Sequence, residues 1–146
     1  MRRMKKMLVF LTGLAVLFCA GSAFAEKFEI EVPYALHGGD WWSGLALSNT
    51  GDSSIDVGIW TYNSGVPVKV GALTLEPFSM KTRMLPDFFT EMPYPTADGG
   101  RVSLGIVASG NEAKRDFKFT LFVGSPQGFS FQSYDFSNAR YKSVVD

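Results

Sequence analysis

Hydrophobic and polar residues alternate along most of the chain after residue 25, and helical spacing is rare. In the first segment with this pattern, Phe28, Ile30 and Val32 lie on one face of the chain, and Glu29 and Glu31 lie on the other. A period of two is typical of a strand that is buried on one face and solvated on the other. The pattern therefore predicts a protein built mainly from half-buried strands.

Similar segments follow at intervals of about 8–12 residues, with turn formers between them. Their apolar positions fall in residues 42–47, 55–59, 66–75, 78–84, 102–106, 117–123 and 129–131. About eight short strands at this spacing predict an all-β fold, an antiparallel two-layer β-sandwich with little helix. Residues 85–90 predict one helical turn, and the prolines and glycines of residues 92–100 predict a loop.

Two details of this pattern leave choices open. The turn formers of residues 49–53 indicate either a hairpin or a corner of the sandwich. Near the end of the chain, Tyr134 and Phe136 have the opposite parity to Phe129 and Phe131. This change of parity predicts a bulge in the last strand or a strand end near Ser133.

The N-terminus has the three parts of a secretory signal peptide. Residues 1–7 are basic, residues 8–20 are almost continuously apolar, and residues 21–25 are mostly small and precede Glu26. The apolar run is shorter than the roughly 20 residues that span a bilayer, and no other segment is long enough. We therefore expect residues 1–25 to be a signal peptide, residues 26–146 a single β-sandwich domain, and the destination to be periplasmic or extracellular.

The one cysteine, Cys19, lies within this leader. An acylated lipoprotein cysteine normally follows a small residue, whereas Cys19 follows Phe18, so we do not expect a lipoprotein. The exported domain then contains no thiol and no disulfide. Its stability must come from its hydrophobic core.

Charge argues against one class of partner. The chain has 14 basic and 14 acidic residues, but four of the basic residues belong to the leader. The exported domain keeps 10 basic and 14 acidic residues, a net charge of about −4. Nucleic-acid binding is not expected, because it needs a concentrated Lys and Arg surface.

The inventory of reactive side chains gives little support for catalysis. His37 is the only histidine, and no Gly-x-Ser-x-Gly elbow accompanies it. Zinc sites usually need several Cys or His ligands, and the glycine pairs lack the spacing of a phosphate loop. We expect no enzyme, no catalytic residue, no cofactor and no metal, although an irregular calcium site stays open. A small hydrolase with paired carboxylates remains an alternative, with candidates Asp40, Asp52, Asp56, Asp87, Glu91 and Asp98.

The aromatic residues are the more informative feature. Trp41 and Trp42 are consecutive, so in a strand they face opposite ways. Trp60 and Tyr62 share the face opposite the apolar positions of residues 55–59. These rings either pack beneath a second layer or form an exposed platform for a sugar or a protein. Trp41, Trp42, Trp60 and Tyr62 are therefore the candidate ligand-binding residues.

Residues 41–52 read Trp-Trp-Ser-Gly-Leu-Ala-Leu-Ser-Asn-Thr-Gly-Asp. This run resembles a phrase of small secreted bacterial all-β domains, W-x-T-G-L-A-L-x-N-P-x-D, in which a short Asp-Leu-Phe segment follows. Residues 85–89 are similar to that segment, so the resemblance covers about residues 34–108. Ser43 stands where threonine is usual, and Thr50 stands where the turn proline is usual. The resemblance implies a sandwich and no catalytic residue.

Together these observations predict an exported, non-enzymatic β-sandwich that acts as an interaction or structural module. Its partner would be a protein or a carbohydrate at the cell surface. The alternatives are a carbohydrate-binding module, a small hydrolase that uses loop carboxylates, and a surface polymer in which unpaired strand edges accept another chain.

Overall fold

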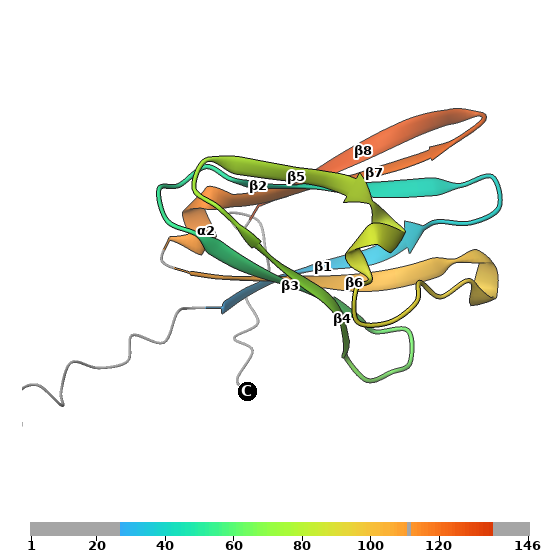
Figure 1. The fold of residues 1–146 in the computed structure, drawn as a ribbon. Helices are drawn as coiled ribbons and strands as arrows, with labels where there is room; N and C mark the ends of the chain where they lie inside the picture. The colour runs from blue at the N-terminus through green and yellow to red at the C-terminus, as the bar shows by residue number, and fades with distance from the viewer. Residues whose placement is uncertain (1–26, 111, 136–146) are drawn as a thin grey trace, which may run out of the picture.

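The computed structural model describes residues 27–110 and 112–135, which form two antiparallel sheets of four strands (Figure 1). The strands are β1 (Lys27–Leu36), β2 (Trp42–Asn49), β3 (Ile55–Thr61), β4 (Val68–Leu75), β5 (Ser79–Met84), β6 (Arg101–Ser109), β7 (Phe117–Ser125) and β8 (Gly128–Asp135). The first sheet has the order β1-β6-β3-β4 and the second the order β5-β2-β7-β8. The expected all-β, two-layer fold of eight strands is confirmed.

Helices are short in the described part of the chain. They are the 3-10 helices η1 (Leu85–Phe88) and η2 (Ala97–Gly99) and the α-helix α2 (Ala113–Asp116). The helical turn expected in residues 85–90 is therefore confirmed. Among residues 27–110 and 112–135, no helix has the length and apolarity that crossing a membrane requires. The expected signal peptide and Cys19 lie outside the described residues.

The core fills the space between the two sheets. In β3, the side chains of Ile55, Val57 and Ile59 are buried, and Asp56 between them is exposed. The facing layer contributes Leu45 and Leu47 from β2, and further core side chains are Leu104, Ile106, Phe117 and Phe119. Full burial of each such side chain stabilises the fold by roughly 1.5–3 kcal/mol. This core is large enough to support a domain without a disulfide.

The chain passes repeatedly from one sheet to the other. Strands β3 and β4 form a hairpin within the first sheet, and β7 and β8 form one within the second. By contrast, β2 belongs to the second sheet and β3 to the first. The turn at residues 49–53 is therefore a corner of the sandwich.

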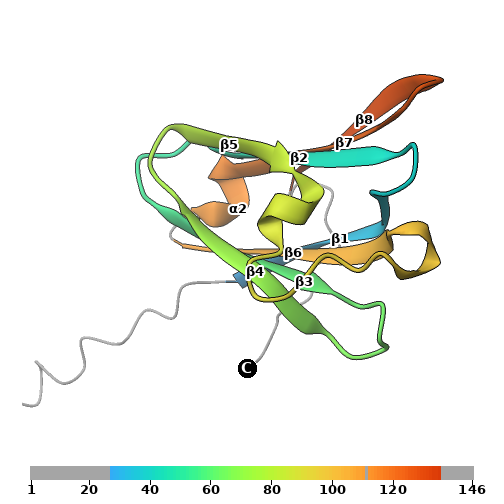
Figure 2. The ribbon, with the colours of Figure 1, turned by 45° about the vertical axis from the view of Figure 1, so that its right-hand side comes forward.

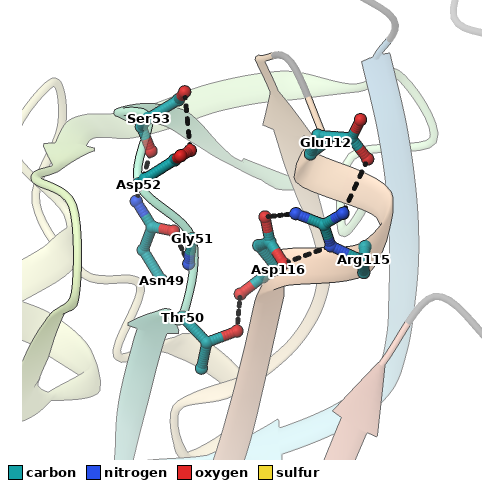
Figure 3. Close-up of polar contacts among 8 residues, drawn as sticks. All are labelled: Asn49, Thr50, Gly51, Asp52, Ser53, Glu112, Arg115 and Asp116. Carbon is teal, nitrogen blue, oxygen red and sulfur yellow. Dashed lines mark hydrogen bonds and ion pairs between the residues drawn. The ribbon is translucent and has the colours of Figure 1, made fainter.

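The side chain of Asn49 holds this corner together (Figure 3). Its Nδ2 donates to the carbonyl oxygens of Ser53 at 2.8 Å, Glu76 at 3.1 Å and Leu75 at 3.3 Å. Its Oδ1 accepts the N–H of Gly51 at 2.9 Å. Asn49 is buried, so one amide group satisfies main-chain groups that could otherwise lack partners.

The corner also packs against the end of α2 (Figure 3). The N–H and the hydroxyl of Thr50 both donate to the carbonyl oxygen of Asp116, at 2.9 and 3.2 Å. A proline at position 50 has neither group, so the departure from the turn proline has a structural use here. Arg115 donates two hydrogen bonds to the Asp116 carboxylate and pairs with Glu112 at 3.6 Å. The bonds from Arg115 hold the pKa of Asp116 below its usual range.

Strand β5 differs from the sequence-based expectation. The alternation of residues 78–84 predicted that the phenylalanine and methionine side would be buried, yet Phe78 is 74% exposed and Met80 is 68% exposed. Lys81 and Arg83 instead stand opposite Leu47 and Leu45 of β2, on the inward parity. Because β5 is an edge strand, its long inward-pointing side chains can bend around the rim of the sheet and reach solvent. Lys81 does so and donates to a carbonyl oxygen of β4.

The last strand also corrects the sequence-based expectation. The pairing of β8 with β7 runs from residue 128 to residue 135 without a shift, so the strand has no bulge and continues past Ser133, while Phe136 lies outside the described residues. The change of parity arises because β8 carries aromatic residues on both faces. Tyr134 points inward and stacks on Phe119 at a centroid distance of 4.6 Å, whereas Phe129 and Phe131 point outward.

Candidate binding surfaces

The four aromatic residues singled out by the sequence do not form one cluster. Trp60 and Tyr62 lie half-buried on the outer face of the first sheet. Trp42 is exposed on the outer face of the second sheet, on the other side of the core. Trp41 is exposed in the turn before β2, where its backbone forms an isolated bridge with Gly38. The structure therefore offers two separate candidate surfaces.

Three of these rings share a local arrangement in which the ring covers a glycine. A Cβ atom at Gly58 would lie 3.2 Å from Nε1 of Trp60, so the indole lies along its own strand. A Cβ atom at Gly124 would overlap the ring of Trp42, which stands directly opposite it in β2. Tyr62 covers Gly105 in the same way, and its hydroxyl donates to the carboxylate of Glu29. A glycine inside a strand is thus the sequence signal for an aromatic ring that lies close against the backbone of the sheet.

The first surface is an open groove around Trp60. It has a volume of about 540 Å³, and Gly58 and Ser109 are among the residues that line it. Asp56 and Thr74 face it as a pair, because the Thr74 hydroxyl donates to the Asp56 carboxylate at 2.7 Å. The groove therefore combines one indole ring with carboxylate and hydroxyl groups.

The second surface lies on the outer face of the second sheet. The strand registers place Trp42 beside Gly124 and Phe129 in one row, and Met84 beside Gly44, Phe122 and Phe131 in the next. Trp42 stacks on Phe129 at 6.4 Å and 16°, and Phe129 stacks on Phe131 at 6.4 Å and 29°. We call this surface the aromatic face; it consists of Trp42, Met84, Phe122, Phe129 and Phe131.

Sequence reasoning found only Trp42 on this face. The sequence pattern predicts only that Phe129 and Phe131 are the apolar positions of a half-buried strand. In the structure they are 64% and 66% exposed. Contiguous exposed apolar side chains on a small domain often mark an interaction surface. The sequence signal for this exposure is Tyr134, whose parity along the strand is opposite to that of Phe129 and Phe131. Because Tyr134 packs on the inward face of β8, the two phenylalanines must point outward.

The only histidine has a structural role in the described region. Nδ1 of His37 accepts the N–H of Ser43 at 3.1 Å, and its ring lies edge-on to Tyr94 at 5.8 Å. The Ser43 hydroxyl in turn donates to the carbonyl oxygen of Leu36. These bonds tie the end of β1 to β2, so the serine that replaces the usual threonine of the phrase is a structural residue.

The candidate carboxylates are dispersed over the molecule. Asp56 is bonded to Thr74, and Glu91 pairs with Lys69 at 3.0 Å. Asp40 and Asp87 are exposed, Asp52 accepts a bond from its neighbour Ser53, and the side chain of Asp98 lies outside the described part. Within the described residues, no group of three or more His, Cys, Asp or Glu side chains is placed to hold a metal ion.

Comparison with known proteins adds a fold and no activity. No protein-family model matches the chain, and no curated protein matches it. A crystal structure of a Thermotoga maritima protein is similar, with a TM-score of 0.50 and 12% sequence identity. The match covers 83% of this chain and 97% of that one. At this identity the likeness concerns the fold alone.

Proposed function

We propose that this protein is an exported, non-enzymatic binding module and that the aromatic face is its contact surface. The observation that supports this most is the exposure of three stacked rings, Trp42, Phe129 and Phe131. Covering a fully exposed phenylalanine gains roughly 1.5–3 kcal/mol, so two of them can supply a large share of a binding free energy. Aromatic side chains also lose little conformational entropy on binding.

The remaining parts of the proposal rest on the sequence. Export is inferred from the leader of residues 1–25. A non-enzymatic role is inferred from the small inventory of reactive groups, in which His37 already uses Nδ1 for a backbone bond. Binding would depend on shape and apolar contact, with no chemical step.

The test measures how much of each protein in the cell-envelope fraction and the culture medium of the source cells is captured by the unaltered protein and by its variants. In the double variant Phe129→Ser and Phe131→Ser, we expect at least a tenfold loss of a partner that the unaltered protein retains. Both side chains are exposed, so the unfolding midpoint should stay nearly unchanged.

Phe78→Ser is the matched control. Phe78 is at least as exposed, but it lies in the connection between β4 and β5, beyond the end of β2 that carries Asn49. Its variant should bind like the unaltered protein. Equal capture by all three proteins, or equal loss in Phe78→Ser, would refute the aromatic face as the contact surface.

A second candidate function is carbohydrate binding at the Trp60 groove. The half-buried indole of Trp60 lines the groove and offers an aromatic surface to a sugar ring, and Asp56 and Thr74 provide hydrogen-bonding groups beside it. Glycan-array binding and quenching of tryptophan fluorescence should then be lost in Trp60→Ala. Both signals should persist in Trp42→Ala, which alters the other sheet. The absence of any response over a broad polysaccharide panel would count against this function.

A further inference from the structure

The four edge strands of the sandwich are not equivalent. Strands β1 and β4 border the first sheet, and β5 and β8 border the second. The outer main-chain groups of an edge strand can pair with another chain, and proteins usually prevent this with proline, charge or a bulge.

Three of the edges carry such protection. Strand β1 contains Pro33, and its register with β6 shifts between Val32 and Ala35. Strand β4 contains Lys69, and its register with β3 shifts between Ile59 and Trp60.

Strand β5 is protected by charge. It places Lys81 and Arg83 at inward parity on the rim of the sandwich. An inward-pointing charge at an edge disfavours extension of the sheet, because a further strand would bury it.

Strand β8 carries none of these devices from Gly128 to Tyr134. Its sequence there, GFSFQSY, has no proline and no charged residue, and its pairing with β7 is regular throughout. Within the described residues, no strand pairs with its outer edge. The tip of the β7–β8 hairpin rises away from the other strands in both views (Figures 1 and 2), which leaves this edge accessible.

We propose that β8 pairs antiparallel with β8 of a second copy of this chain, so that two second sheets join into one sheet of eight strands. With Ser130 on the two-fold axis, Phe129 of each copy stands opposite Phe131 of the other. Both residues have the same parity, so the outer face of one sheet continues into that of the next. The inference does not depend on the proposed function, because it concerns the main-chain edge and not the aromatic face.

A second copy fits this edge better than a foreign strand for two reasons. Residues 128–134 are uncharged, so two identical strands meet without repulsion. Among the four edges formed by the described strands, symmetric pairing also uses the unprotected one, and the other three carry proline, a bulge or inward charge. The assembly therefore closes as a dimer and does not continue as a polymer.

Light scattering coupled to size-exclusion chromatography measures the mass directly over a range of protein concentrations. The purified protein should show about twice the mass of one chain. The double variant Ser130→Lys and Gln132→Lys should halve that mass with an unchanged unfolding midpoint, because both side chains are exposed. Gln127→Lys, in the turn before β8, adds charge beside the edge and should stay dimeric.

Three outcomes would overturn the inference. They are a monomer at all concentrations, a dimer that survives both lysines at the edge, and a dimer that Met84→Lys dissociates. Met84 lies on the aromatic face but on β5, so its effect would indicate face-to-face packing. If the unaltered protein is a monomer and the double variant Phe129→Ser and Phe131→Ser still loses partner capture, the edge pairing is refuted and the proposed function stands.

Discussion

At the scale of single residues, a few polar side chains hold the corner of the sandwich at residues 49–53 together. Asn49 makes four hydrogen bonds to main-chain groups of the corner and of the β4 end. Gly51 is needed beside it because any Cβ there would overlap the carboxylate of Asp116. The phrase that suggested a sandwich thus ends in the residues that build the corner.

Asn49→Ala should lower the free energy of unfolding by roughly 2–3 kcal/mol, because buried main-chain groups lose their partners. Urea denaturation followed by tryptophan fluorescence measures the loss. Ser48→Ala is the neighbouring control; its hydroxyl makes one exposed bond of 3.3 Å, so the change should stay within about 0.5 kcal/mol. Equal stability of the two variants would show that water replaces Asn49 at the corner.

At the scale of elements, the direction of a strand's faces depends on its neighbours. Strand β5 alternates apolar and cationic residues, so its sequence permits either face to point inward. The structure turns Lys81 and Arg83 inward, because an edge strand lets their long stems reach solvent. The methionines are consequently exposed.

The double variant Met80→Gln and Met84→Gln should therefore change the free energy of unfolding by no more than about 0.5 kcal/mol. Leu47→Ala on the adjacent strand should cost about 2–5 kcal/mol, because it opens a cavity in the core. Thermal or urea denaturation distinguishes the two results. A loss of several kcal/mol in the methionine variant would mean that β5 faces the other way.

At the scale of the whole molecule, the loop of residues 92–100 is tied to the rest of the domain through Tyr94. Its ring packs edge-on against Phe89 at 4.8 Å, and its hydroxyl donates to the carbonyl oxygen of Gly100 at 2.7 Å. Burial raises the pKa of Tyr94 to about 12. In the unfolded chain this pKa is close to 10.

This difference predicts a loss of stability in alkali. Below a pH of about 10 the hydroxyl is protonated in both states, so its contribution to stability is intact. Above it, the unfolded chain ionises first, and stability falls until the pH passes the folded pKa of about 12. Urea denaturation at a pH of about 8 and about 11 should show this decrease.

Tyr94→Phe is the control for this decrease. It should be less stable at a pH of about 8, since it lacks the bond to Gly100, but its further loss in alkali should be smaller. Some loss should remain, because burial also raises the pKa of Tyr134. An identical alkaline decrease in both proteins would refute the assignment to Tyr94.

The sequence by itself determined the number of strands, their approximate bounds, the short helix after β5 and, for the part of the chain that the structure describes, the lack of long helices. These features are local, because period-two alternation and turn formers act within a few residues. It also identified Trp41, Trp42, Trp60 and Tyr62 as candidate binding residues.

Only the tertiary structure decided which sheet each strand joins, which face of β5 and β8 points inward, and which rings share a surface. These features depend on residues far apart in the sequence, such as Trp42 and Phe129, whose stacking requires β7 to lie between their strands. Alternation distinguishes the two faces of a strand. When both faces carry large side chains, packing against the neighbouring strands decides which face points into the core.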